Sequence, residues 1–129
     1  MSVEKQAIFP EGGPAPVGPY SPVVASGDLV FVSGHVGFDP PTGRIVGETF
    51  EAQAHQMFKN LARALHAAGC DFSHVLKTTA FITRAEDFAE FNEIYKQYVP
   101  APYPARSTVV AALVVEGLLV EVEMVARRP

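Results

Sequence analysis

The chain has 129 residues, of which 48% are hydrophobic and 19% charged, and this predicts one folded domain spanning residues 1–129. The composition excludes a disordered or low-complexity protein, because a chain with this hydrophobic content can bury enough apolar surface to offset the entropy lost on folding. The net charge of −4 argues against broad nucleic-acid binding, which needs clustered Lys and Arg side chains along the phosphate backbone.

The N-terminal sequence and the cysteine content predict a cytoplasmic protein. Residues 1–6 carry neither the basic stretch nor the apolar stretch of a secretory signal. No apolar run approaches the ~20 residues that span a bilayer, so we expect no membrane segment. The single cysteine, Cys70, cannot form an internal disulfide, which is typical of a reducing compartment.

The first third of the chain reads as an irregular segment followed by strands. Residues 10–22 contain five prolines and three glycines, which exclude regular structure. This segment is either a loose lead-in or an extended arm that places Tyr20 against the body. Residues 28–33 are rich in β-branched and aromatic side chains and predict a strand. A turn over residues 39–43 and a short returning strand over 44–46 follow.

The middle of the chain predicts two helices around a strand. Apolar residues recur at helical spacing from Phe50 to Ala68, and Gly69 is a natural stop. Residues 75–82 predict a strand, after which Thr83 and Glu86 match a capping box for a second helix. One stripe of this helix is aromatic, and Pro100 ends it.

The last third predicts two strands, over residues 107–115 and 118–126. The resulting order, β-β-β-α-β-α-β-β, predicts an α+β domain with a mostly antiparallel sheet and both helices packed on one sheet face. The other face would then expose Val109, Ala111 and Leu113, or their even-numbered neighbours. A sheet with an uncovered apolar face usually buries it against copies of itself, so we expect a homo-oligomer.

Two kinds of side chain are candidates for chemistry. Arg106 follows a proline-stiffened loop at the start of a strand, where a guanidinium suits a two-pronged grip on a carboxylate. The alternative is an ordinary surface ion pair. Glu121 and Glu123 lie on the same side of the final strand, where one of them is placed to orient or deprotonate a water. The alternative is a solvent-facing strand with two ordinary acids.

Other residues give weaker indications. Tyr20 and Ser33 lie beside glycines or prolines, where they either contact a ligand or serve packing and turn formation. Asn92 is a poor mid-helix residue and has either a polar partner or a solvent-facing position. The four histidines and Cys70 show no metal-ligand spacing, and no nucleophile elbow or phosphate-binding loop is present. We therefore predict no metal site.

Several segments, kept in order along nearly the whole chain, resemble the RidA family (also called YjgF). They are Gly-Pro-Tyr-Ser-Pro at 18–22, Val-Phe-Val-Ser-Gly at 30–34, Lys-Thr-Thr-Ala-Phe-Ile at 77–82, Tyr-Pro-Ala-Arg-Ser at 103–107 and Val-Glu-Val-Glu at 120–123. The resemblance implies a chorismate-mutase-like α+β fold. It also implies a homotrimer whose three sheets face inward as a barrel, with ligand clefts at the subunit boundaries.

The resemblance further implies a cofactor-free deaminase. Such an enzyme hydrolyses enamines and imines, for example 2-iminopropionate derived from 2-aminoacrylate, to 2-keto acids and ammonia. Carried over by position, Arg106 would hold the substrate carboxylate and Glu121 would position the attacking water. Further residues would contact the substrate or line the cleft: Tyr20, Ser33, Gly34, Asn92 and Thr108.

The sequence departs from the family pattern at three places. Thr108 stands where many members have cysteine, His35 stands where glutamine is common, and residues 112–117 lack an Arg-Leu-Pro often found there. Two alternatives to the deaminase therefore remain open. One is a non-catalytic trimeric binder of small carboxylates or partner proteins. The other is a ribonuclease, which the acidic net charge disfavours.

Overall fold

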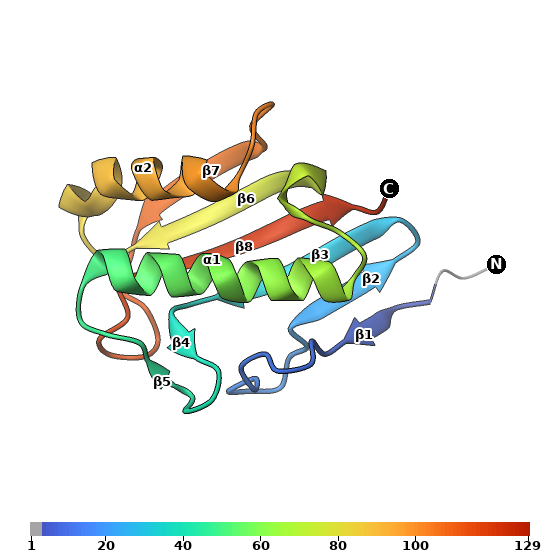
Figure 1. Ribbon diagram of the computed structural model, residues 1–129, viewed down its shortest axis with the longest axis horizontal. Helices are drawn as coiled ribbons and strands as arrows, with labels where there is room; N and C mark the ends of the chain where they lie inside the picture. Colours follow the sequence, from blue (N-terminus) through green and yellow to red (C-terminus); the bar gives the residue numbers. More distant parts are fainter. Residues whose placement is uncertain (1–3) are drawn as a thin grey trace.

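The computed structural model describes residues 4–129, and a six-stranded sheet forms its centre (Figure 1). Across the sheet the strands run β1 (Gln6–Ile8), β2 (Val23–Ser26), β3 (Leu29–His35), β8 (Val120–Arg127), β6 (Val75–Ile82) and β7 (Ala105–Val110). All neighbours pair antiparallel except β6 and β7, which are parallel. A separate two-stranded hairpin joins β4 (Phe38–Asp39) to β5 (Arg44–Ile45).

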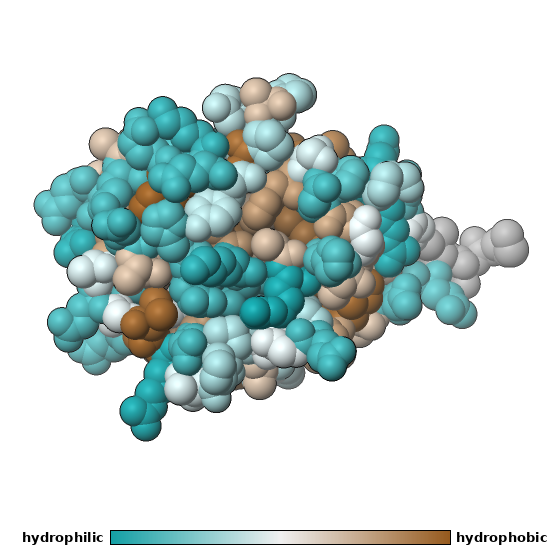
Figure 2. Space-filling view, in the orientation of Figure 1, coloured by the Kyte–Doolittle hydropathy of each residue, from teal (hydrophilic) through white to brown (hydrophobic). Residues whose placement is uncertain are grey.

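Two α-helices, α1 (Phe50–Ala67) and α2 (Phe88–Tyr98), lie on one face of this sheet (Figure 1). Short 3-10 turns, η1 (Phe72–His74) and η2 (Ala85–Asp87), precede β6 and α2. The predicted α+β class, with two helices on one face of a mostly antiparallel sheet, is confirmed. The outer side of the helices is mainly hydrophilic (Figure 2). Within residues 4–129, no helix has the length and apolar character needed to cross a membrane.

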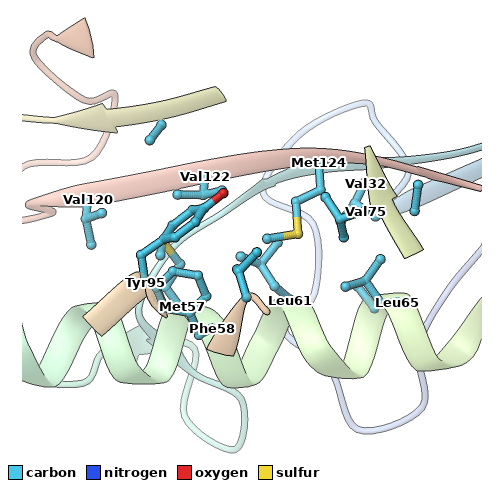
Figure 3. Packing of buried hydrophobic residues seen from close by; sticks show 14 of the residues in the cluster. Val32, Met57, Phe58, Leu61, Leu65, Val75, Tyr95, Val120, Val122 and Met124 are labelled. Carbon is cyan, nitrogen blue, oxygen red and sulfur yellow. The ribbon is translucent and has the colours of Figure 1, made fainter. Parts of the chain in front are cut away.

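The core lies between α1 and the middle of the sheet. The even-numbered residues of β8 are buried, whereas its odd-numbered residues are partly or fully exposed, as the alternation in the sequence predicts. The side chains of α1 that face them recur at helical spacing and are also buried. Figure 3 shows this packing between Met57, Phe58, Leu61 and Leu65 of α1 and Val120, Val122 and Met124 of β8.

Several predicted elements differ from those observed. Within residues 4–129, five strands precede α1, where the sequence predicts three, because β1 and β4 are only three and two residues long. The strand predicted over 107–115 instead spans Ala105–Val110. It stops there because its partner β6 ends at Ile82, whose carbonyl accepts the last inter-strand hydrogen bond from Ala111 N. Residues 111–119 therefore form a loop.

The predicted capping box at Thr83 and Glu86 is wrong. The helical segment begins after Arg84, whose Nε donates to Asp87 Oδ2 at 2.8 Å. The backbone N–H of Thr83 donates instead to Leu119 O, which holds Thr83 outside the helix. The tertiary hydrogen bond thus takes the place of the local cap.

Asn60 is a buried side chain that ties α1 to the segment following β3. Its Nδ2 donates to Val36 O at 3.0 Å and to Phe38 O at 2.9 Å, and the residue is 1% exposed. Asn60→Ala would leave both carbonyls buried without a donor, so we expect a loss of about 2–3 kcal/mol in the free energy of unfolding. Urea denaturation measures this, with the exposed neighbour Lys59→Ala as control. Equal stability of the two variants would contradict the assignment.

Candidate active site

Four of the predicted site residues line one cleft on the bare face of the sheet. The cleft has a volume of about 510 Å³, and its lining includes Tyr20, Ser33, Gly34 and Glu121. The pairing of β3 with β8 shifts between Val32 and His35, so Ser33 and Gly34 lie outside the regular ladder. This irregularity brings the backbone at Gly34 against the side chain of Glu121.

The N-terminal segment packs over this cleft as an arm. Ser33 fixes the end of the arm, since its Oγ donates to Ser21 O at 2.6 Å and its N–H donates to Pro22 O at 2.9 Å. The hydroxyl of Tyr20 accepts a hydrogen bond from Val17 N at 3.2 Å. Of the two interpretations of residues 10–22, the structure supports the arm. Tyr20 and Val17 both form part of the cleft wall.

Gly34 allows a close approach that no other residue would permit. A Cβ built on Gly34 would lie 2.8 Å from Glu121 Cδ, with the carboxylate oxygen Oε2 nearer still. An alanine would therefore displace the carboxylate of Glu121 while leaving the backbone unstrained, because only the end of a flexible side chain stands in the way.

We expect Gly34→Ala to lower the activity of any reaction that uses Glu121 by roughly 10-fold or more, because displacements near 1 Å can cost about 100-fold. Its thermal stability should stay close to wild type. The matched control is Gly47→Ala, whose Cβ would meet only Ala52 Cβ at an ordinary 3.6 Å. Full activity of Gly34→Ala would show that the position of the carboxylate does not matter.

The surroundings of Glu121 make its carboxyl group a weaker acid than a free glutamate side chain. Partial burial, and secondarily repulsion from the Glu123 carboxylate, raise the pKa of Glu121 above its usual value. A carboxyl group with a raised pKa exchanges protons more readily near neutral pH, which suits a general acid or base.

Arg106 lies elsewhere, at the outer edge of the sheet beneath α2. Its Nη2 donates to Asn92 Oδ1 at 2.8 Å. The guanidinium carbon also lies 5.7, 5.4 and 4.9 Å from the ring centroids of Phe88, Phe91 and Tyr95. These cation–π contacts and the amide hold the guanidinium in one orientation.

No carboxylate of residues 4–129 forms a salt bridge with Arg106, so the surface ion pair considered above is absent from the described chain. The guanidinium instead borders a pocket of about 390 Å³ shared with Asn92, Lys96 and Tyr103. A fixed cation with unused hydrogen-bond donors beside a pocket is suited to binding an anion.

A single chain holds Arg106 and Glu121 on opposite faces of the sheet. Arg106 pairs in register with Thr78, which is buried under the helices and contacts Tyr95 Oη. Glu121 pairs with Phe81, an odd-numbered residue of β6 whose side chain points to the bare face. Within one chain the two side chains therefore cannot contact the same small molecule.

The two remaining predicted site residues, Asn92 and Thr108, both lie on the Arg106 side of the sheet. Asn92 lies with Arg106, and Thr108, two residues further along β7, points to the same side as Arg106. Thr108 borders a neighbouring hollow together with Phe88 and Ile82. Within one chain the predicted site residues therefore form two separate groups, one around Glu121 and one around Arg106.

His35 lies beneath the arm, beside the cleft but not in its wall. Its Nδ1 is 2.7 Å from Ser33 O, and it borders a small adjoining cavity of about 40 Å³. Burial lowers the pKa of His35, so the ring is neutral at physiological pH. Over residues 4–129, no three His, Cys, Asp or Glu side chains are grouped so that they could hold a metal ion.

Comparison with known proteins decides the family. A sequence model of the family described as endoribonuclease L-PSP, which includes the RidA proteins, matches residues 11–128. The chain belongs to the RidA family. Its match to the chloroplastic reactive intermediate deaminase A of Arabidopsis thaliana is 43% identical and covers 97% of this chain and 67% of that protein.

Two further RidA relatives match over most of their length. The human 2-iminobutanoate/2-iminopropanoate deaminase is 38% identical, over 97% of this chain and 91% of that protein. The crystal structure of RidA from the Antarctic bacterium Psychrobacter has a TM-score of 0.90 and 39% identity, and the match covers 95% of this chain and 98% of that one. The resemblance seen in the sequence is confirmed.

Proposed function

We propose that this RidA protein is an imine deaminase, which hydrolyses 2-imino acids such as 2-iminopropionate to 2-keto acids and ammonia. The proposal rests on the side chains of Arg106 and Glu121. Arg106 is a fixed guanidinium with no carboxylate partner in the described chain, and Glu121 is a carboxyl group whose pKa is raised. The names of the human and plant relatives agree with this chemistry.

We propose that the working protein is a homotrimer, because one chain cannot complete the site. The side chains of Phe31 and Val109 are 45% and 43% exposed on the face that the helices leave bare, which favours burial against other copies. In such a trimer the Arg106 group of one copy meets the Glu121 group of the next. Three sites then form, one at each subunit boundary.

In the proposed reaction the substrate carboxylate binds the guanidinium of Arg106 through two hydrogen bonds. Asn92 and the aromatic rings keep the guanidinium oriented, and Thr108 lies beside it. Glu121 holds a water and takes its proton as the water oxygen bonds to the C=N carbon. The proton then passes to the nitrogen, and the C–N bond breaks as Glu121 takes the remaining hydroxyl proton, so that ammonia leaves and the carbonyl forms. Tyr20, Ser33 and Gly34 shape the cleft around the reacting carbon.

The protonated imine is itself a good electrophile, so the reaction as proposed uses no cofactor. The chain contributes placement of the substrate and an oriented water, both of which reduce the entropic part of the barrier. We also place the protein in the cytoplasm, in keeping with its single cysteine thiol, Cys70, which is buried and free.

The family description as an endoribonuclease names a second reaction to weigh. The carboxylates of Glu121 and Glu123 line the cleft, where they would repel a phosphodiester backbone. The net charge of −4 adds to this repulsion. These negative charges therefore favour a small substrate, whose single carboxylate binds Arg106, over RNA.

The deciding experiment generates 2-iminopropionate in place, by oxidation of alanine with an amino-acid oxidase, and follows its decay with and without the protein. Light scattering on the same sample gives the oligomeric state. Accelerated decay by a trimer supports the proposal. Decay at the uncatalysed rate, combined with Arg106-dependent calorimetric binding of 2-ketobutyrate, would replace the enzyme with a non-catalytic binder.

A further inference from the structure

The cleft beside Glu121 has walls that are mostly apolar. The apolar part of the cleft wall comes from Val17 of the arm, from Val36 and Phe38, and from Val114, Val115 and Leu118 of the loop 111–119. Val114 is fully exposed to solvent. This loop is also the segment where the sequence departs from the Arg-Leu-Pro pattern, so the chain presents valines in the lining of its cleft.

The loop that carries the valines is anchored at both ends. At its start, Ala111 N donates to Ile82 O at 3.0 Å. At its end, the buried amide of Gln53 accepts from Leu119 N at 2.8 Å and donates to Gly117 O at 2.9 Å. Gln53 is 0% exposed, so this anchor is part of the core. The apolar wall is therefore preformed, which lowers the entropic cost of binding a side chain against it.

The cleft is larger than the smallest substrates of the proposed reaction require. Its volume of about 510 Å³ lies in the range of roughly 300–1,000 Å³ that encloses drug-sized ligands. Its charged lining groups are Glu121 and Glu123, and most of its other lining residues are apolar, Val114 and Val115 among them. A substrate bound beside Glu121 would therefore meet mainly apolar side chains with its own side chain.

We infer that this cleft selects 2-imino acids with a branched or extended aliphatic side chain, such as the imine derived from leucine, over the imine derived from alanine. The inference rests on the proposed deaminase function. Contacts of the substrate side chain with Val114 and Val115 would favour the larger imine over the smaller one. Imino acids with an acidic side chain are disfavoured, since their second carboxylate would face Glu121 and Glu123.

The test compares kcat/KM for imines produced in place from leucine, alanine and glutamate. We expect the leucine-derived imine to be preferred to the alanine-derived imine by about 10-fold or more, because one methylene in an apolar pocket changes specificity by about 10–200-fold. The glutamate-derived imine should be the poorest of the three. Calorimetry with 4-methyl-2-oxopentanoate and pyruvate gives the same comparison without turnover.

The variant Val114→Ser/Val115→Ser should reduce the preference for the leucine-derived imine by about 10-fold. The matched control is Val46→Ser, an exposed valine that does not line the cleft beside Glu121. If the preference is absent, or is unchanged in the double variant, the inference is overturned while the deaminase stands. If none of the imines decays faster with protein, the deaminase function itself fails.

Discussion

Arg106→Ala is expected to lower kcat/KM for 2-iminopropionate by roughly 100-fold or more, because hydrogen bonds to charged groups contribute about 1.5–3 kcal/mol each and the variant removes two. Pre-steady-state or initial-rate measurements on imine generated in place would show the loss. The same substitution should abolish calorimetric binding of 2-ketobutyrate, since the carboxylate would have no cation to bind.

Arg106→Lys separates charge from geometry. The lysine keeps a positive charge near α2 but lacks the planar fork that grips both carboxylate oxygens. We expect activity between those of wild type and Arg106→Ala. Thermal unfolding of both variants controls for packing, because the guanidinium also contacts the rings of Phe88, Phe91 and Tyr95. A folded Arg106→Ala protein with wild-type kcat/KM would show that Arg106 does not bind the substrate carboxylate.

Glu121→Gln is expected to lower kcat by about 100- to 10,000-fold, the usual contribution of a general acid or base. The substitution should also stabilise the protein at neutral and alkaline pH. Because the pKa of Glu121 is raised in the folded state, folding favours the protonated carboxyl group. The stabilising contribution of this group is complete below the unfolded-state pKa and is lost as the pH rises through the folded-state pKa.

Thermal melts of wild type and Glu121→Gln at pH 4 and pH 8 test the stability half of this prediction. The difference in Tm between the two proteins should favour the variant at pH 8 and shrink toward pH 4. Glu123→Gln provides the electrostatic comparison, since loss of its charge should move the acidic limb of the rate profile to lower pH. A variant that is less stable than wild type at pH 8 would contradict the raised pKa.

Much of the fold could be predicted from periodicity, which depends on local chemistry. The β8 alternation and the α1 repeat both placed their buried faces correctly, and β6 matched its predicted bounds. The end of β7 could not be predicted, because Val110 is followed by apolar residues that continue the strand pattern. The length of the neighbouring β6, a tertiary feature, ends the strand there.

The sequence names candidate site residues but does not predict how they are arranged. The proline loop before Arg106 and the alternating glutamates single out the candidate groups, whereas their placement on opposite sheet faces depends on the parallel pairing of β6 with β7. Two buried amides, Gln53 and Asn60, hold loops in place, and no motif in the sequence marks them. A polar residue on the apolar face of a predicted helix is the signal that could have found them.

We expect each active site to take Arg106 from one copy and Glu121 from another. Mixing Arg106→Ala and Glu121→Gln subunits, after joint unfolding and refolding, tests it directly. Each variant alone should be inactive. With equal amounts and random assembly, about one site in four would combine an intact Arg106 with an intact Glu121 across a boundary, so about a quarter of wild-type activity should return. Mixed trimers as inactive as the separate variants would contradict the shared site.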